Sequence, residues 1–338
     1  MSRVRGYLRD PAGLWPNTAA LTYAIAGYVI GWWCMFHPSL SLNVGGAILL
    51  GHAMIIAAYL IHDCAHNAIF KNPHHNVRLG AALNWLTGGC YGRFEDLRYK
   101  HLRHHNANAD LISFDYRVFL LRHPRLLRVV SVLEWFYIPA VEILMHAVLT
   151  GAPLVLPGRA AQRTRVVTVI IIRVVLLVGV ALVSLKAFLF YLLAQGLLLT
   201  VLRFMDAFQH TYAISLLLDD RDAGNEQRGN RAYEEANTYS NLISTRWPWL
   251  NLLTLNFAYH NAHHAHPIAG WYRLPQLHDE LYPQDCAQQV LFVDQLRCFH
   301  RHRVARVLGE NDDQFDMVAS TRAGAAVGAA ALSFLTAF

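Results

Sequence analysis

The chain has 338 residues, of which 54% are hydrophobic and 15% are Asp, Glu, Lys or Arg. Ordinary soluble domains hold about a quarter charged residues, so this composition argues against a water-soluble monomer. The formal net charge is +6, but the basic residues are interleaved with apolar runs rather than gathered on one soluble face. This distribution favours an anionic membrane surface over nucleic acid as the partner.

Four apolar stretches are long enough to cross about 30 Å of hydrocarbon: residues 17–36, 39–61, 166–184 and 187–205. The connection within each pair is short, so each pair is expected to form a transmembrane hairpin. Thirteen Lys and Arg residues lie within 62–165, whereas the two tight turns carry only Lys186. By the positive-inside rule, both hairpins should open toward the cytoplasm. The sequence therefore predicts an all-α, multi-pass integral membrane protein.

Some parts of the chain need a separate interpretation. Arg173 lies within the third span, where a charge must face protein or reach the membrane surface. The run 126–157 is apolar, but it contains Glu134, Pro139, Glu142 and His146. We expect this run to be an amphipathic helix lying in the membrane interface, because a fifth crossing would separate the histidine motifs described below. The stretch 79–91 is too short to span and receives the same interpretation.

The predicted cap consists of the two segments that follow the hairpins, residues 62–165 and 206–316. Each half of the chain is thus a hairpin followed by a polar, cytoplasmic, histidine-rich segment. We interpret residues 1–316 as one membrane domain with interfacial helices. The apolar tail 317–338 is weakly patterned and receives no predicted structure.

Three histidine motifs stand in these two segments: HDCAH at 62–66, HLRHH at 101–105 and HNAHH at 260–264. Helical residues at i, i+3 and i+4 share one face, so each motif predicts a patch of imidazoles. His210 follows the fourth span, in the place that HDCAH takes after the second. Neutral imidazole binds iron, zinc and copper, and eight or nine such groups suit two ions rather than one. Two redox-capable ions favour oxygen activation over hydrolysis.

Several histidines lack this spacing and are interpreted as ordinary structural or surface residues: His52, His74, His75, His266, His278, His300 and His302. Two other classes of protein remain as alternatives. A membrane zinc hydrolase would hold about one metal per chain. A metal transporter would place its ligands near the bilayer midplane, whereas these motifs stand at span ends.

The three motifs, in this order around two hairpins, resemble those of the membrane fatty acid desaturase superfamily. The segment NTYSNLISTRWPWLNLLTLNFAYHNAHHAHP (237–267) also resembles the family's approach to its third motif, and the similarity covers about residues 17 to 285. The resemblance implies two iron ions in a non-haem centre on the cytoplasmic face, with O₂ as co-substrate. Its implied ligands are His62, His66, His101, His104, His105, His260, His263 and His264, with His210 as an additional one.

The resemblance also suggests neighbours and partners for this centre. Asp63, Asp206 and Asn261 are candidates for orienting the imidazoles. Some relatives have Glu in the third motif where this chain has Ala262, which separates it from ceramide-type desaturases and carotenoid ketolases. The three His-Pro sites lack the HPGG haem-binding signature, so electrons are expected from a separate ferredoxin, rubredoxin or cytochrome b5.

Desaturation of a fatty acyl chain is the reaction that the resemblance favours. Decarboxylation of a fatty acid to a terminal alkene, hydroxylation, and ketolation of a carotenoid remain alternatives at the same metal site. Basic residues near the motifs could bind a carboxylate or phosphate, but we interpret them as membrane-surface side chains: Arg93, Arg98, Lys100 and Arg103. The sequence predicts neither the substrate nor the oligomeric state.

Overall fold

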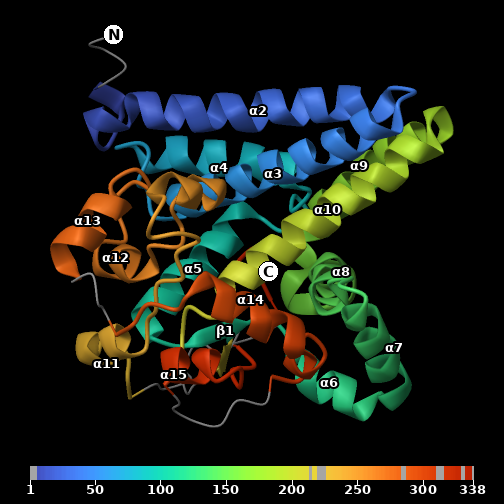
Figure 1. The fold of residues 1–338 in the computed structure, drawn as a ribbon. Helices are drawn as coiled ribbons and strands as arrows, with labels where there is room; N and C mark the ends of the chain where they lie inside the picture. Colours follow the sequence, from blue (N-terminus) through green and yellow to red (C-terminus); the bar gives the residue numbers. More distant parts are fainter. Residues whose placement is uncertain are drawn as a thin grey trace.

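The computed structural model describes residues 6–212, 215–218, 226–282, 287–309, 316–328 and 332–336. This part of the chain is mostly helical, as predicted (Figure 1). Its one sheet has two short parallel strands, β1 (Asp110–Ile112) and β2 (Ser215–Leu217), with Asp110 opposite Ser215. The strands join the segment after the second histidine motif to the segment after His210.

Within the described residues, four helices are long and apolar enough to cross a membrane: α2 (Leu14–Phe36), α3 (Leu40–Ala65), α9 (Arg163–Val183) and α10 (Leu185–Asp206). These are the four predicted spans, with boundaries that differ by a few residues. Many apolar side chains on α2, α9 and α10 are exposed, and Leu182 on α9 is 83% exposed. A continuous exposed apolar surface of this kind requires lipid around it. The chain is therefore a membrane protein.

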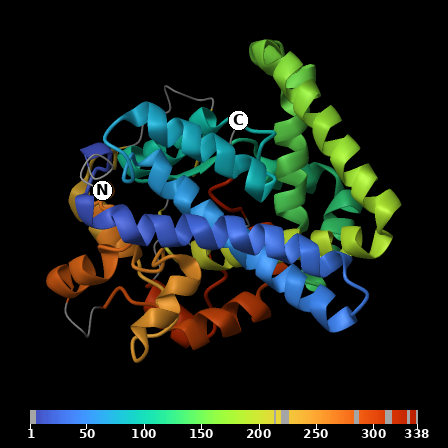
Figure 2. The same ribbon diagram turned by 90° about the horizontal axis from the view of Figure 1, so that it is seen from above.

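The first two long helices pack closely along their length. In Figure 1 α2 and α3 lie side by side, and from above α2 covers part of α3 (Figure 2). Their closest approach uses two glycines, because a Cβ atom at Gly31 would lie 2.9 Å from the carbonyl oxygen of Gly46. The connection is held by Asn43, whose amide donates to the carbonyls of Cys34, Met35 and His37 at 3.0, 3.0 and 2.8 Å.

Helix α3 lies at the centre of the fold. It contacts α2, α10, α4 (Pro73–Thr87) and α5 (Phe94–Ala107), and every residue from Ala53 to His66 is buried. The apolar stretch 79–91 lies mostly in α4, whose fifteen residues are too few to span. Arg173 of α9 is buried against α10, where it donates to the Tyr191 hydroxyl at 2.5 Å. The expectation that this charge faces protein or reaches the membrane surface is thus met by a protein contact.

The prediction of one amphipathic helix over 126–157 is wrong. The structure has two helices there, α7 (Pro124–Trp135) and α8 (Ala140–Val155), separated by a turn in which Tyr137 has a φ of 62°. Glu134 is buried, and its Oε1 accepts the Val141 N–H at the start of α8 at 3.0 Å. Its Oε2 accepts from Arg203 of α10 at 3.1 Å. Glu134 suggested a water-facing side in the sequence. In the structure it lies at the end of α7 and binds both the start of α8 and Arg203 of α10.

The remaining elements are short: η1 (Pro11–Gly13), α6 (Tyr116–Arg122), η2 (Pro157–Gln162), α11 (Arg231–Ala236), η3 (Pro248–Thr254), α12 (His260–Ala265), α13 (Leu274–Leu281), α14 (Phe292–Arg301), η4 (Ala305–Val307) and α15 (Met317–Arg322). In Figure 1 α5, α11, α12, α14 and α15 lie together on one side of the α2–α3 pair. The tail that had no predicted structure contributes α15 and the segment Leu332–Thr336, most of which is buried.

Candidate metal centre

The structure brings the nine predicted histidines into one group beneath the end of α3. They come from four parts of the chain: the last turn of α3, α5, the segment after α10, and α12. Most are nearly inaccessible to solvent, and His263 is 2% exposed. The nine are His62, His66, His101, His104, His105, His210, His260, His263 and His264. Their role as ligands remains a prediction, which the geometry below makes specific.

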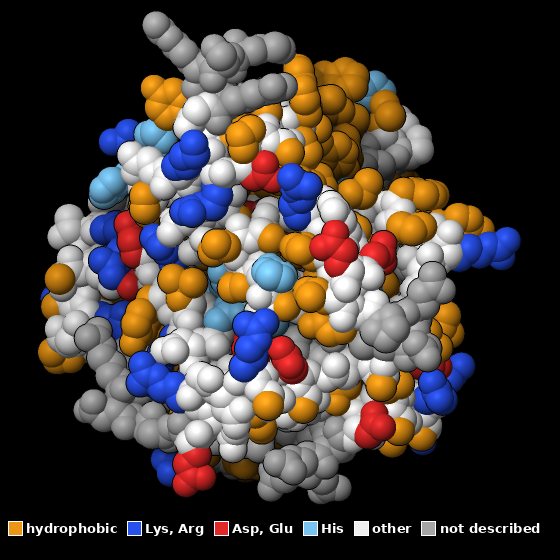
Figure 3. Space-filling view, turned by 90° about the vertical axis from the view of Figure 1, so that its left-hand side faces the viewer, with side chains coloured by type: hydrophobic (Ala, Val, Ile, Leu, Met, Phe, Trp, Pro, Cys, Tyr) orange, Lys and Arg blue, Asp and Glu red, His pale blue; other side chains and the backbone are white. Residues whose placement is uncertain are grey.

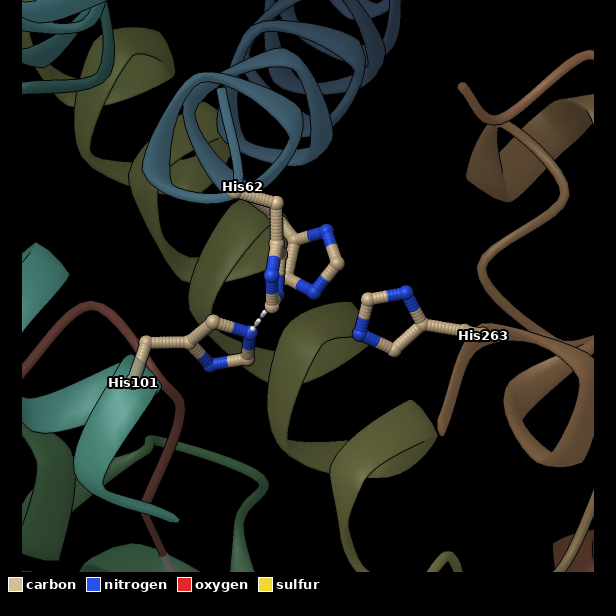
Figure 4. Close-up of side chains that lie close together, drawn as sticks. His62, His101 and His263 are labelled. Atoms are coloured by element: carbon tan, nitrogen blue, oxygen red, sulfur yellow. Dashed lines mark hydrogen bonds between the residues drawn. The ribbon is translucent and has the colours of Figure 1, made fainter. Parts of the chain in front are cut away.

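Four of these side chains form a first cluster: His62, His66, His101 and His263. One ring nitrogen from each lies within 4.8 Å of the others. Nε2 of His66 is 2.7 Å from Nε2 of His101. In Figure 4 the rings of His62, His101 and His263, which come from α3, α5 and α12, are turned toward a common point. Two nitrogens that bind one ion at about 2.1 Å each are at most about 4.2 Å apart, so this cluster needs only small shifts to hold a metal.

A second cluster consists of His104, His210, His260 and His264. Ring nitrogens of His104, His210 and His264 lie within 4.8 Å of one another. Nε2 of His210 is 2.8 Å from Nε2 of His260 and 3.1 Å from Nε2 of His104. His210 therefore joins the second motif to the third, as its place after α10 predicts.

His105 lies between the clusters and makes a metal the better explanation of both. Its Nε2 is 3.3 Å from Nε2 of His101 and 3.1 Å from Nε2 of His263. Together with the His66–His101 pair, this gives three contacts along a row of four Nε2 atoms, in the order His66, His101, His105 and His263. Each Nε2 carries either one proton or one lone pair, so hydrogen bonds can satisfy at most two of the three contacts. If all four Nε2 lone pairs instead point at a bound cation, every one of these nitrogens has a partner.

Four of these imidazoles, those of His101, His104, His105 and His263, are in the protonation state that metals require. Burial, followed by repulsion from neighbouring imidazoles, holds the pKa of His101, His105 and His263 well below 6.5. Burial lowers the pKa of His104 to about 4. At neutral pH these rings are uncharged, and a neutral imidazole offers a lone pair to a metal ion.

Acidification should destabilise the metal-free chain between about pH 6.5 and pH 4. An unfolded histidine takes up its proton near pH 6.5, whereas folded His104 does so only near pH 4, so the unfolded state binds more protons in this window. Each such proton lowers the free energy of unfolding by roughly 1.4 kcal/mol per pH unit. Thermal unfolding of metal-free protein should show a midpoint that falls steadily from pH 7 to pH 5. A constant midpoint would contradict a buried, neutral cluster.

Hydrogen bonds donated by Nδ1 atoms fix which nitrogen faces the clusters. His104 Nδ1 donates to the Ala109 carbonyl at 2.9 Å, and His264 Nδ1 donates to Glu234 Oε1 at 2.7 Å. These bonds leave Nε2 with its lone pair. The Nε2 atoms of His62 and His264 are buried and have no hydrogen-bond partner. Buried nitrogens without partners, directed at other nitrogens, fit residues that hold metal ions.

Glu234 is a residue of this site that the sequence did not reveal. It lies on α11, and its carboxylate falls within 4.8 Å of ligand atoms of His105 and His264. It also lines a small opening between α11 and α12, together with Arg231 and Tyr282. The left-hand side of the molecule in Figure 1 carries mixed charged and apolar side chains, with histidine near the centre of the face (Figure 3). In RAYEEAN (231–237) no spacing distinguishes Glu234 from its neighbour Glu235.

Replacing Glu234 with glutamine should weaken metal binding about 10- to 100-fold, because a carboxylate partner raises the basicity of its histidine and fixes the ring. Competition with a chelator of known affinity measures this change. Glu235→Gln is the matched control, because that carboxylate pairs with Arg231 at the surface. Equal metal affinity in the two variants would contradict a role for Glu234 at the site.

A cavity of about 100 Å³ adjoins both clusters. It is lined by His101, His104, His210 and His260, and by polar and apolar residues from α5, β1, α10 and the tail: Lys100, Asp110, Leu111, Ile112, Asp206, Gln209, Phe257, Leu332, Ser333 and Phe334. The ring of Phe334 lies against those of Tyr59, His62, His101 and Phe257. The tail therefore closes one side of the site.

The interpretation of Lys100 as a membrane-surface residue is wrong. It is 7% exposed, and its Nζ donates to the Thr336 carbonyl at 2.5 Å. Burial lowers its pKa to about 8. The bond to the tail replaces water, which explains how a lysine is accommodated there. Arg103 also bonds within the protein, to the Leu218 carbonyl at 2.8 Å, whereas Arg93 is partly exposed and pairs with Asp96.

The three candidate orienting residues make different contacts. Asp63 Oδ1 is 3.6 Å from His62 Nδ1, which is too long for a hydrogen bond, and its Oδ2 accepts the Trp271 N–H at 3.1 Å. Asp206 Oδ2 accepts the Phe334 N–H at 3.1 Å. Asn261 Oδ1 accepts from the Ser240 hydroxyl at 3.2 Å, and the backbone N–H of Asn261 donates to Ser240 Oγ. These bonds position backbone segments around the histidines, so orientation of imidazoles by these residues stays a prediction.

The histidines that were interpreted as structural lie apart from both clusters. His52 bonds the Tyr23 hydroxyl at 2.6 Å and the Leu253 carbonyl at 3.0 Å. His302 bonds the Gly324 carbonyl at 2.9 Å, and His278 is buried beside Tyr259. Motif spacing therefore separated the clustered histidines from the rest.

Comparison with known proteins agrees with this geometry. The family model described as fatty acid desaturase matches residues 39–297. That range begins just before α3 and contains all three histidine motifs and His210. A search of curated proteins gave no match. Because the match covers most of the chain, this protein belongs to the fatty acid desaturase family.

Proposed function

We propose that this protein is a membrane-bound oxidoreductase that holds two iron ions and removes hydrogen from a fatty acyl chain. The observation that carries the proposal is the convergence of nine buried or half-buried histidines, eight in two adjacent clusters and His105 between them. Family membership supports oxidation of a fatty acid, and imidazole suits iron. The simplest reaction consumes O₂, two electrons and two protons, converts a CH₂–CH₂ unit into CH=CH, and releases two molecules of water.

The histidines would divide between two ions. His62, His66, His101 and His263 would hold one, and the second cluster would hold the other, with His105 available at the boundary. Bound iron would supply the activation of O₂ that breaks an unactivated C–H bond.

The chain's own contribution would be to position the substrate and exclude water. Eight of the rings are carried by α3, its C-terminal cap, α5 and α12, and hydrogen bonds such as His104 Nδ1 to Ala109 O fix individual rings further. Phe257 and Phe334 provide apolar surface beside the histidines, where part of a lipid chain can lie. Such fixed geometry aligns one C–H bond with the reactive centre and limits side reactions.

We further propose that α2–α3 and α9–α10 are transmembrane hairpins that open toward the cytoplasm. The basic residues that follow α3 support this orientation by the positive-inside rule. The histidine clusters would then face the cytoplasm, where a separate ferredoxin, rubredoxin or cytochrome b5 could deliver electrons. The lipid substrate would enter from the bilayer.

Product analysis tests the proposal. Membranes from a bacterial host that expresses the chain, supplied with perdeuterated fatty acids and O₂, should yield products that lack two deuterium atoms of the substrate. Iron chelation should abolish these products, and addition of Fe²⁺ should restore them. An alkene shorter by one carbon would indicate decarboxylation, and a product heavier by one oxygen would indicate hydroxylation. Hydrolysis products that depend on zinc and not on O₂ would refute the oxidoreductase proposal.

A further inference from the structure

A second cleft, separate from the metal centre, lies beside the start of α2. Its volume is about 370 Å³, and its lining comes from three segments: the residues before η1, the residues after α3, and the connection from α12 into α13. Among the described residues, none lines both this cleft and the cavity beside the histidines. The start of α2 and α13 lie toward the same end of the molecule (Figure 1). The proposed oxidation leaves this cleft without a role.

The basic side chains of the cleft retain donors for a ligand. Arg9 donates from Nε to the Asn67 carbonyl at 2.8 Å, and the described residues supply no partner for its two Nη groups. Arg273 donates from Nε to Asp10 Oδ2 at 3.0 Å, and its Nη1 lies 3.5 Å from Gln276 Oε1. Its Nη2 has no partner in the described part of the chain. Guanidinium groups with available Nη atoms bind phosphate oxygens through charge-assisted hydrogen bonds.

The charge of the lining favours an anionic ligand. Asp10 is the one carboxylate among the described residues of the lining, and both of its oxygens are engaged. Oδ1 accepts the Ala12 N–H at 2.9 Å, and Oδ2 accepts from Arg273. Glu280 on α13 lies outside the lining. Because two arginines face one aspartate, the lining carries one positive charge in excess, which attracts an anion.

The position of the cleft indicates which anion reaches it. Arg9 stands two residues before the span that begins at Pro11, and Ala68 stands three residues after α3 ends. Side chains this close to the ends of transmembrane helices lie at the level of the lipid head groups. Trp15 in the first turn of α2 is more than half exposed, as is Ile268 in the lining of the cleft. An anion with an apolar part therefore fits better than a soluble one.

The connection between α12 and α13 joins the cleft to the metal centre. Arg273 lines the cleft, and Trp271, two residues earlier, donates its backbone N–H to Asp63 Oδ2 at 3.1 Å. The indole Nε1 of Trp271 donates to Asn17 Oδ1 on α2 at 3.0 Å. Asp63 is the neighbour of His62 in the first cluster. A ligand that fixes Arg273 therefore also holds the segment that binds α3 beside the histidines.

We propose that this cleft binds the phosphate head group of an anionic membrane phospholipid through Arg9 and Arg273. It is a second lipid site, separate from the one at which lipid is oxidised, and its lipid stays chemically unchanged. Bound lipid stabilises the segment that follows the third histidine motif. The inference depends on the chain being a membrane protein and not on the proposed oxidation.

Native mass spectrometry of the purified full chain in detergent micelles tests the inference. The probes are phosphatidylglycerol and phosphatidylcholine with identical acyl chains, because choline adds a cation that cancels the phosphate charge. One phosphatidylglycerol per chain should bind at least about fivefold more tightly than phosphatidylcholine, since one basic side chain contributes roughly that factor toward an anionic lipid. Equal affinities for the two lipids would overturn the inference.

Two soluble competitors identify the source of the anion. Glycerol 3-phosphate carries a phosphate head group without acyl chains, and hexaglutamate represents the acidic surface of a partner protein. Neither should displace phosphatidylglycerol when present at the same concentration. Displacement by glycerol 3-phosphate would assign the cleft to a soluble phosphate, and displacement by hexaglutamate would assign it to a protein. Either result would overturn the proposed lipid site.

Arg9→Gln should weaken the binding of phosphatidylglycerol roughly fivefold. Arg322→Gln is the control with the same change of charge, because Arg322 is exposed on α15 and does not line the cleft. Phosphatidylglycerol should also raise the midpoint of thermal unfolding more in the control than in Arg9→Gln, because binding stabilises the folded state. Equal affinity and equal stabilisation in the two variants would refute a role for Arg9. If Arg9→Gln does not fold, the comparison of the two lipids in the wild type still decides.

Discussion

Replacing His263 with alanine should abolish the proposed lipid oxidation and remove at least one of the two proposed iron ions, while the chain remains folded. His263 contributes to the first cluster and lies 3.1 Å from His105, which links that cluster to the second. Loss of a residue that only orients a ligand costs about 10- to 100-fold in metal affinity or activity, so loss of a ligand should cost more. Iron content and product formation are measured on the same preparation.

His52→Ala is the matched control for this variant. His52 is a partly buried histidine that bonds Tyr23 and Leu253, outside both clusters. The His52→Ala variant should keep the metal content and most of the activity of the wild type. If the His263 variant retained two irons and normal product formation, the assignment of the first cluster as a metal site would be wrong.

Replacing Arg203 with methionine should lower the free energy of unfolding by about 3–5 kcal/mol, because it leaves the buried Glu134 carboxylate without its cation. Arg203 and Glu134 are each about 4% exposed and lie 3.1 Å apart. The pair joins α10 to the last turn of α7. Chemical denaturation in detergent micelles, with paired measurements on the wild type, gives the difference.

Two companion variants identify the cause. Arg231→Met breaks an ion pair whose side chains are more than half exposed, and it should change stability little. Arg203→Met combined with Glu134→Leu should recover part of the loss, because no unpaired buried charge remains. Equal destabilisation by the Arg203 and Arg231 variants would show that burial of the Arg203 pair contributes nothing specific.

The features that the sequence predicted are those encoded by local spacing. Long apolar runs identify helices that can cross a membrane, and the i, i+3, i+4 pattern places His101, His104 and His105 on one face of α5. The three motifs also occur in the order found in the desaturase family, and this resemblance predicts that they meet at one site. His210 could also be predicted from the sequence, because its place after α10 matches that of HDCAH after α3.

The remaining features depend on contacts between distant segments. Glu134 in an apolar run resembles a residue on the wet side of an interfacial helix until α10 supplies Arg203. In the sequence Lys100 resembles a surface lysine. In the structure it is buried because it donates to the carbonyl of Thr336, which is more than two hundred residues away. Glu234 and Phe334 stand in segments without periodicity. No local pattern distinguishes such residues, because their role is defined by the partner and not by the spacing.

Metal quantification tests the central claim most directly. The chain, purified from cells grown with both iron and zinc, is measured by inductively coupled plasma mass spectrometry together with the His263→Ala variant. We predict close to two irons and little zinc per wild-type chain, and one iron or none in the variant. One zinc per chain with no iron, unchanged by the substitution, would contradict a two-iron centre built from the histidine clusters.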